Sequence, residues 1–216
     1  RHRLRPGETD GAGRVDVVPG RVGLAVPALG LLGTWRGGSG TDPATVVRTE
    51  RGEVTWECLT LDADATVRVR GREFAGPGYA EVVRLTLAPW ELGFADLRWG
   101  RFIADDRSDA MTWIATGSGV TFVGAWTPRV RFRQEAEVGE GSVLVTGGPE
   151  LTWGAGAPIR RGTVTRSLLG RLAPLGRLLP RGVRRLEEDK TLSRGALLDG
   201  GASRPGWVLH ERVRWR

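Results

Sequence analysis

Residues 54–113 read VTWECLTLDADATVRVRGREFAGPGYAEVVRLTLAPWELGFADLRWGRFIADDRSDAMTW. Short runs rich in Val, Thr, Leu and Trp alternate here with turn-prone clusters such as Asp62-Ala63-Asp64 and Gly76-Pro77-Gly78. Runs of β-branched and aromatic residues bounded by Gly, Pro and Asp are typical of antiparallel strands. The stretch therefore predicts an all-β fold.

The same rhythm continues on both sides of this stretch, with further clusters at Arg51-Gly52, Gly117-Ser118-Gly119 and Gly147-Gly148-Pro149. Together these signals predict strands at 53–61, 66–70, 79–88, 96–104, 110–116, 120–126, 130–138, 142–146 and 207–215. So many short strands with so little helix predict an antiparallel barrel or a barrel-like sandwich.

One segment, 167–186, breaks this rhythm because its leucines recur at spacings of three and four residues among arginines. That spacing is typical of a helix, but interspersed prolines and glycines limit its length. We predict a short helical segment packed on the barrel. A basic amphipathic segment lying on an anionic membrane surface is the alternative.

The chain of 216 residues is long enough to form one large β domain. We assign 1–13 to a loose N-terminus and 14–216 to a single β-barrel-like domain. The single cysteine, Cys58, excludes an internal disulfide, and no run approaches the ~18 apolar residues of a membrane span. Because no signal-peptide pattern is present at its start, we expect a soluble, cytoplasmic protein.

The net charge of +7 and the pI of about 11.1 would ordinarily indicate binding to nucleic acid or an anionic membrane. However, only one of the 32 basic Lys and Arg side chains is a lysine, and asparagine is absent. The basicity therefore reflects biased composition as much as a basic face. We predict no nucleic-acid partner, and a weak membrane-surface contact only through the arginines between Arg160 and Arg185.

Strand alternation places several charged side chains on the apolar faces of their strands. Tyr79 and Glu81 share a face with the hydrophobic residues of their run, as do Trp99 and Arg101 in the next and Glu211 in the last. An unpaired buried charge costs several kcal/mol. Arg101 is therefore expected to pair with Glu81 or Glu211.

Two interpretations of these charges are open. In the first, they form a structural ion pair that stabilises the barrel. In the second, Glu81 faces a cavity in which desolvation raises its pKa, so that it can donate a proton as a catalytic acid. Tyr79 and Arg101 would then position Glu81.

The nine tryptophans favour a core role, as aromatic residues in strands usually do, but several could also wall a cavity. Flat indole walls suit an extended apolar ligand. We predict that Trp56, Trp99 and Trp113 line such a cavity and that Glu211 contacts the ligand. The predicted partner is a lipophilic small molecule, with no metal and no cofactor.

Other catalytic arrangements find little support in the sequence. The two histidines are His2, in the loose terminus, and His210, which alternates opposite Glu211 and is predicted to lie at the surface or rim. A Ser-His-Asp triad is therefore not expected. Asp105, Asp106 and Asp109 match no calcium loop and are predicted to form a hairpin turn.

Several short motifs occur in a fixed order along the chain. They are W-x-C (Trp56, Cys58), Gly-Tyr-x-acid (Gly78, Tyr79, Glu81), Pro-Trp (Pro89, Trp90), W-x-R (Trp99, Arg101) and a closing His-Glu-x-Val-x-Trp at 210–215. In this order the sequence resembles the lipocalin-like (calycin) superfamily that contains carotenoid hydratases and related double-calycin proteins, over about two thirds of the chain.

The resemblance implies calycin-like barrels, metal-free chemistry and isoprenoid or polyketide-like ligands. It also implies hydration, cyclisation or pericyclic catalysis as the expected activities. The chain would then be an incomplete form of the double-calycin arrangement. A non-catalytic carrier or accessory scaffold domain is the alternative, because many relatives carry no established activity.

Overall fold

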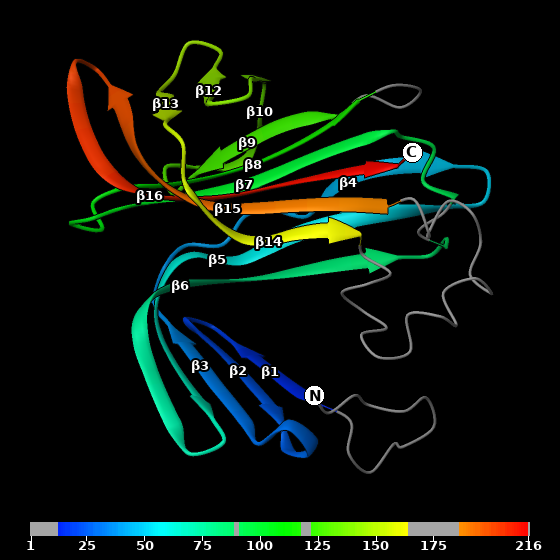
Figure 1. Cartoon of the computed structure of the whole chain (residues 1–216), viewed down its shortest axis with the longest axis vertical. Helices are drawn as coiled ribbons and strands as arrows, with labels where there is room; N and C mark the ends of the chain where they lie inside the picture. Colours follow the sequence, from blue (N-terminus) through cyan, green and yellow to red (C-terminus); the bar gives the residue numbers. More distant parts are fainter. Residues whose placement is uncertain (1–12, 89–90, 118–121, 164–185, 216) are drawn as a thin grey trace. The chain divides into compact units, whose positions relative to one another are not determined.

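The computed structural model describes residues 13–88, 91–117, 122–163 and 186–215. Within these ranges, strands make up all the regular structure except one 3-10 turn, η2 (Pro27–Leu29), and the strands pair antiparallel (Figure 1). The predicted all-β antiparallel fold is confirmed. The helical segment predicted near 167–186 falls mostly on 164–185, outside the described residues, and Leu186 itself begins a strand.

The chain divides into two compact units that interleave in the sequence. The first comprises Arg1–Asp42 and Glu57–Val82, and the second comprises Pro43–Trp56 and Val83–Arg216. Strand β5 (Gly52–Val69) belongs in part to each. The predicted boundaries, a terminus at 1–13 and one domain over 14–216, stay a prediction. No helix in the described ranges is long and apolar enough to cross a membrane.

In the first unit, four strands pair in chain order and a fifth pairs beside them. The strands β1 (Arg14–Val18), β2 (Arg21–Val26), β3 (Leu31–Arg36) and β5 are neighbours in that order, and β6 (Arg72–Leu85) pairs with β5. The β5–β6 hairpin turns at Arg70 and Gly71, where φ is 49° and 81°. Two positive φ values suit the two-residue hairpin turn, which favours glycine.

Two predicted turns in this unit are wrong, because both lie inside strands. Residues 62–64 continue β5, where Ala63 is fully buried and Asp64 pairs with Arg36 of β3. Residues 76–78 continue β6, and a Cβ added at Gly78 would lie 2.6 Å from the Cβ of Ala65. Strand pairing overrides the local turn preference here, and Gly78 marks a close approach of two strands instead.

The second unit contains the larger sheet. The strands of this sheet are β7 (Asp96–Ala104), β8 (Ala110–Gly117), β9 (Val123–Thr127), β10 (Val130–Gln134), β11 (Ala136–Val138), β12 (Ser142–Val145), β13 (Glu150–Trp153), β14 (Ala157–Thr163), β15 (Leu186–Asp199) and β16 (Ala202–Trp215). The unit also contains β4 (Ala44–Thr49) and the start of β5, which belong to the smaller sheet. The sheet order is β10-β9-β8-β7-β16-β15-β13-β12-β11, and β14 also pairs with β15 (Figure 1). The short segment β4 pairs with the start of β5.

This larger sheet is a nearly closed barrel. Its two edge strands, β10 and β11, are consecutive in the chain and are separated by Glu135 alone. The Thr146 N–H, at the end of β12, donates a hydrogen bond of 3.0 Å to the Glu135 carbonyl. Inside, a buried apolar cluster fills the barrel with Phe102, Met111, Val143, Val145, Leu151, Leu197 and Val208, among others.

The register of the central strands sorts their side chains onto two faces. Gly100 of β7 lies opposite both His210 of β16 and Trp113 of β8, so these residues share the face that carries the buried cluster. Trp99 and Glu211 form the adjacent pair of opposing residues, so their side chains lie on the other face of the sheet. Successive strand residues point to opposite sides, so this register decides which residues reach the barrel interior.

Candidate functional site

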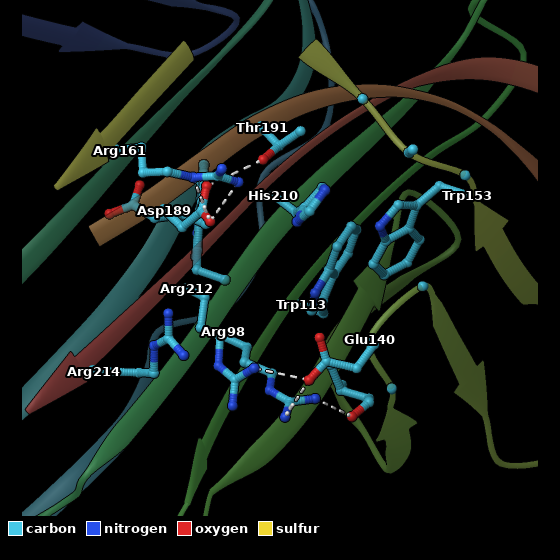
Figure 2. Close-up of a pocket in the computed structure, with 18 residues that line it drawn as sticks. Arg98, Trp113, Glu140, Trp153, Arg161, Asp189, Thr191, His210, Arg212 and Arg214 are labelled. Atoms are coloured by element: carbon cyan, nitrogen blue, oxygen red, sulfur yellow. Dashed lines mark hydrogen bonds and ion pairs between the residues drawn. The ribbon is translucent and has the colours of Figure 1, made fainter. Parts of the chain in front are cut away.

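A pocket of about 650 Å³ lies in the second unit, beyond the buried apolar cluster (Figure 2). Strands β7, β8, β15 and β16 supply one part of its lining, and the glycine-rich segments 139–141 and 154–156 supply another. Its volume lies within the range of about 300–1,000 Å³ typical of small-molecule sites. The pocket therefore has the size of a ligand-binding site.

An aromatic wall of Trp113, Trp153 and His210 runs along one part of this pocket (Figure 2). The indoles of Trp113 and Trp153 stack with centroids 5.3 Å apart and planes 26° apart. The ring of His210 lies 5.4 Å from Trp153. Such a wall presents the flat, polarisable surface that an aromatic or extended apolar ligand prefers.

On the same face of the sheet as His210, the guanidinium groups of Arg98 and Arg212 share two carboxylates, one of which, Glu140, is shown in Figure 2. Arg212 forms a bidentate pair with Asp96 at 3.1 and 3.0 Å, and it also contacts Glu140 at 2.8 Å. Arg98 contacts the same two carboxylates at 3.4 Å each. The hydrogen bonds that Arg212 donates to Asp96 raise the pKa of Arg212, so its positive charge is fixed.

Two more arginines complete the charged part of the pocket. Arg161 of β14 pairs with Asp189 of β15 at 3.0 Å, and Arg214 lies 3.9 Å from Glu187. Both arginines line the pocket. The pocket is therefore apolar and aromatic on one side and rich in paired charges on the other.

His210 is half-buried, and burial lowers its pKa below the usual value. Its Nε2 lies 3.4 Å from the Ser193 hydroxyl, a residue that is almost fully buried. The imidazole is therefore neutral near pH 7. In this state the ring forms part of the pocket lining without adding a positive charge to it.

The lowered pKa of His210 predicts a dependence of stability on pH. The unfolded chain takes up the His210 proton below about pH 6.5, whereas the folded chain resists it. Stability present above that pH is thus lost as the pH falls through this region. We expect His210→Gln to lose less unfolding free energy than the wild type between about pH 7.5 and pH 5.5. Urea unfolding at several pH values measures the free energy of unfolding of both proteins. An equal change of this free energy with pH in the two proteins would contradict the prediction.

The residues predicted from the sequence separate into different parts of the chain. Trp99, Trp113 and Glu211 belong to the pocket lining, although the register places Trp113 on one face of the sheet and the other two on the opposite face. Glu211 pairs with Lys190 at 2.6 Å, and the Lys190 ammonium lies 5.5 Å from the Trp99 ring. Their ligand-binding roles stay a prediction.

The remaining predicted residues lie away from the pocket lining. Trp56 packs against Trp126 with ring centroids 4.6 Å apart, and Arg101 is almost fully buried. Tyr79 and Glu81 lie half-buried on β6 in the first unit. Catalytic roles for Glu81, Tyr79 and Arg101 stay predictions, as does ligand contact by Trp56.

Two further features of the sequence are the Pro-Trp pair and the three aspartates near residue 105. Pro89 and Trp90 lie outside the described residues. Asp105 and Asp106 lie in the hairpin turn between β7 and β8, as predicted, and Asp109 immediately precedes β8. Among the described residues, no group of three His, Cys, Asp or Glu side chains gathers where it could hold a metal ion.

Sequence reasoning missed the pocket's main residues. His210 was expected at the surface or rim, and Trp153 and Glu140 were not singled out. It also missed Glu188, a buried carboxyl that pairs with Arg160 at 2.9 Å and whose pKa is raised by burial and by nearby Glu211. The four charged residues at 187–190 do not show the apolar alternation of a strand, but they belong to β15. Residues 188–190 form ion pairs with the neighbouring strands β14 and β16.

Comparison with solved structures supports the lipocalin-like fold. Kievitone hydratase from Nectria haematococca matches with a TM-score of 0.53 and 8% identity, over 94% of this chain and 64% of that chain. CghA matches with a TM-score of 0.47 and 14% identity, over 91% and 65% of the two chains. The chain thus spans less than two thirds of the length of these structures, and the likeness at 8% identity concerns the fold alone.

Comparisons by sequence give no relative. No protein-family model matches the chain, and no curated protein matches it. The pocket is therefore the main guide to the function of this chain.

Proposed function

We propose that this chain binds an extended, largely apolar small molecule in the pocket of the second unit. The aromatic wall of Trp113, Trp153 and His210 carries this proposal, since stacked rings along a pocket of about 650 Å³ suit a flat or elongated apolar body. An isoprenoid or polyketide-like molecule has such a body. The charged side of the pocket would hold a polar end of the same molecule.

Acid-promoted hydration or cyclisation is the enzymatic form of this proposal. The observation that favours it is the shared fold with a hydratase. The acid predicted for this step, Glu81, does not belong to the pocket lining, nor do Tyr79 and Arg101, which are predicted to position it, so their roles form a separate hypothesis. With a co-purified molecule identified and supplied as substrate, Glu81→Gln is expected to abolish turnover. Unchanged turnover would remove Glu81 from the mechanism.

Two measurements test binding itself. Native mass spectrometry of the purified chain should reveal a co-purified lipophilic molecule of small mass. Titration with N-phenylnaphthylamine, a neutral fluorescent probe with two aromatic ring systems, should show saturable binding at one site and quenching of tryptophan emission. The absence of both a co-purified molecule and saturable probe binding would leave the scaffold alternative.

A further inference from the structure

The geometry points to a ligand that carries an oxyanion of the carboxylate class, which binds the guanidinium groups of Arg98 and Arg212 by taking the place of Glu140. This inference rests on the proposed function and specifies the polar end of the ligand. Its basis is the way in which Glu140 differs from Asp96, although both contact the same pair of arginines.

Glu140 is an exposed residue in a short turn. Its side chain is 79% exposed, and it stands between Gly139 and Gly141 in the loop that joins β11 and β12. Nevertheless its carboxylate contacts Arg212 at 2.8 Å and Arg98 at 3.4 Å inside the pocket lining. An exposed ion pair contributes little stability, so replacing this carboxylate with one from a ligand costs little.

The two arginines keep their positions without Glu140. Arg212 is held by the bidentate pair with Asp96, at 3.1 and 3.0 Å. Arg98 donates to the Val138 carbonyl at 3.2 Å and also contacts Asp96 at 3.4 Å. Both guanidinium groups are therefore preorganised, and such groups bind oxyanions with charge-assisted hydrogen bonds.

The charge balance favours an incoming anion. With Glu140 in place, two guanidinium charges face two carboxylates. When Glu140 leaves, one positive charge is uncompensated in the lining, where Arg161 and Arg214 already have acidic partners of their own. An oxyanion on the ligand restores the balance while its apolar body lies along Trp113 and Trp153.

A pair of probes with the same ring systems tests this inference. Anilinonaphthalene sulfonate carries an oxyanion, and N-phenylnaphthylamine is the same scaffold without it. We expect the wild type to bind the sulfonate about tenfold more tightly, and added salt to weaken only the sulfonate. Arg98→Gln should remove most of this preference, measured as the ratio of the affinities for the two probes.

Glu140→Gln removes a negative charge where Arg98→Gln removes a positive one. Glu140 is exposed, so its substitution should disturb the fold little. Without the competing carboxylate, the preference for the sulfonate over the neutral probe should rise about threefold. Arg194→Gln is the matched control, because Arg194 pairs with Asp105 at the surface outside the pocket lining. Equal affinity for both probes in the wild type and both pocket variants would overturn the inference. Failure of both probes to bind would instead overturn the proposed function.

Discussion

Trp153→Ala is expected to weaken binding of N-phenylnaphthylamine by at least about thirtyfold, because the central member of the aromatic wall is lost. Trp153 contacts both Trp113 and His210, and it is only partly buried. Its removal should therefore reduce affinity far more than stability. Fluorescence titration and thermal unfolding of the same variant separate these two effects.

Trp207→Ala is the matched control for this substitution. Trp207 is 47% exposed on β16 and lies outside the pocket lining, where the Arg194 guanidinium stacks on it. The control should retain the affinity of the wild type. If both tryptophan variants lose affinity equally, the probe binds to exposed aromatic surface and the assignment of the pocket is wrong.

Gly100→Ala is expected to lower the free energy of unfolding by about 3 kcal/mol, the upper part of the range for overpacked cores. A Cβ at Gly100 would overlap the indole ring of Trp113, which lies across this glycine. Trp113 is fully buried and stacked on Trp153, so its ring cannot move away without disturbing the wall. Urea unfolding measures the loss.

The same substitution should also weaken probe binding, because a displaced Trp113 narrows the pocket. Gly117→Ala is a suitable control on the neighbouring strand, since its added Cβ would meet only the Asp96 Cβ, at an ordinary distance of 3.7 Å. A Gly100→Ala protein with unchanged stability and unchanged affinity would contradict the packing described here.

The fold was predictable where alternation was regular. The bounds predicted for β7, 96–104, match the observed Asp96–Ala104, because Leu97, Trp99 and Ile103 alternate with their neighbours. By contrast, β15 was not predicted, since its charged residues at 187–190 resemble a solvated loop. Those charges are compensated across strands, as the Lys190–Glu211 pair shows, and a single sequence does not reveal such pairing.

The site was only partly predictable, for a related reason. Apolar alternation selected the face of Trp99 and Glu211 as the interior of the last strands. The pocket lining includes Trp99 and Glu211, but it also includes His210 and Arg212 from the other face of the same strands, which apolar alternation did not select. Trp113 lines the pocket, and its ligand-binding role stays a prediction. Trp153 lies on a strand of four residues, too short for its periodicity to be recognised.

The most direct test of the central claim is a crystal structure of the chain with bound N-phenylnaphthylamine. We expect the naphthalene ring to lie against the indole of Trp153 at about 3.5–4.0 Å, within the pocket lined by Trp113 and His210. A probe ordered elsewhere on the protein, with this pocket left empty, would contradict the account.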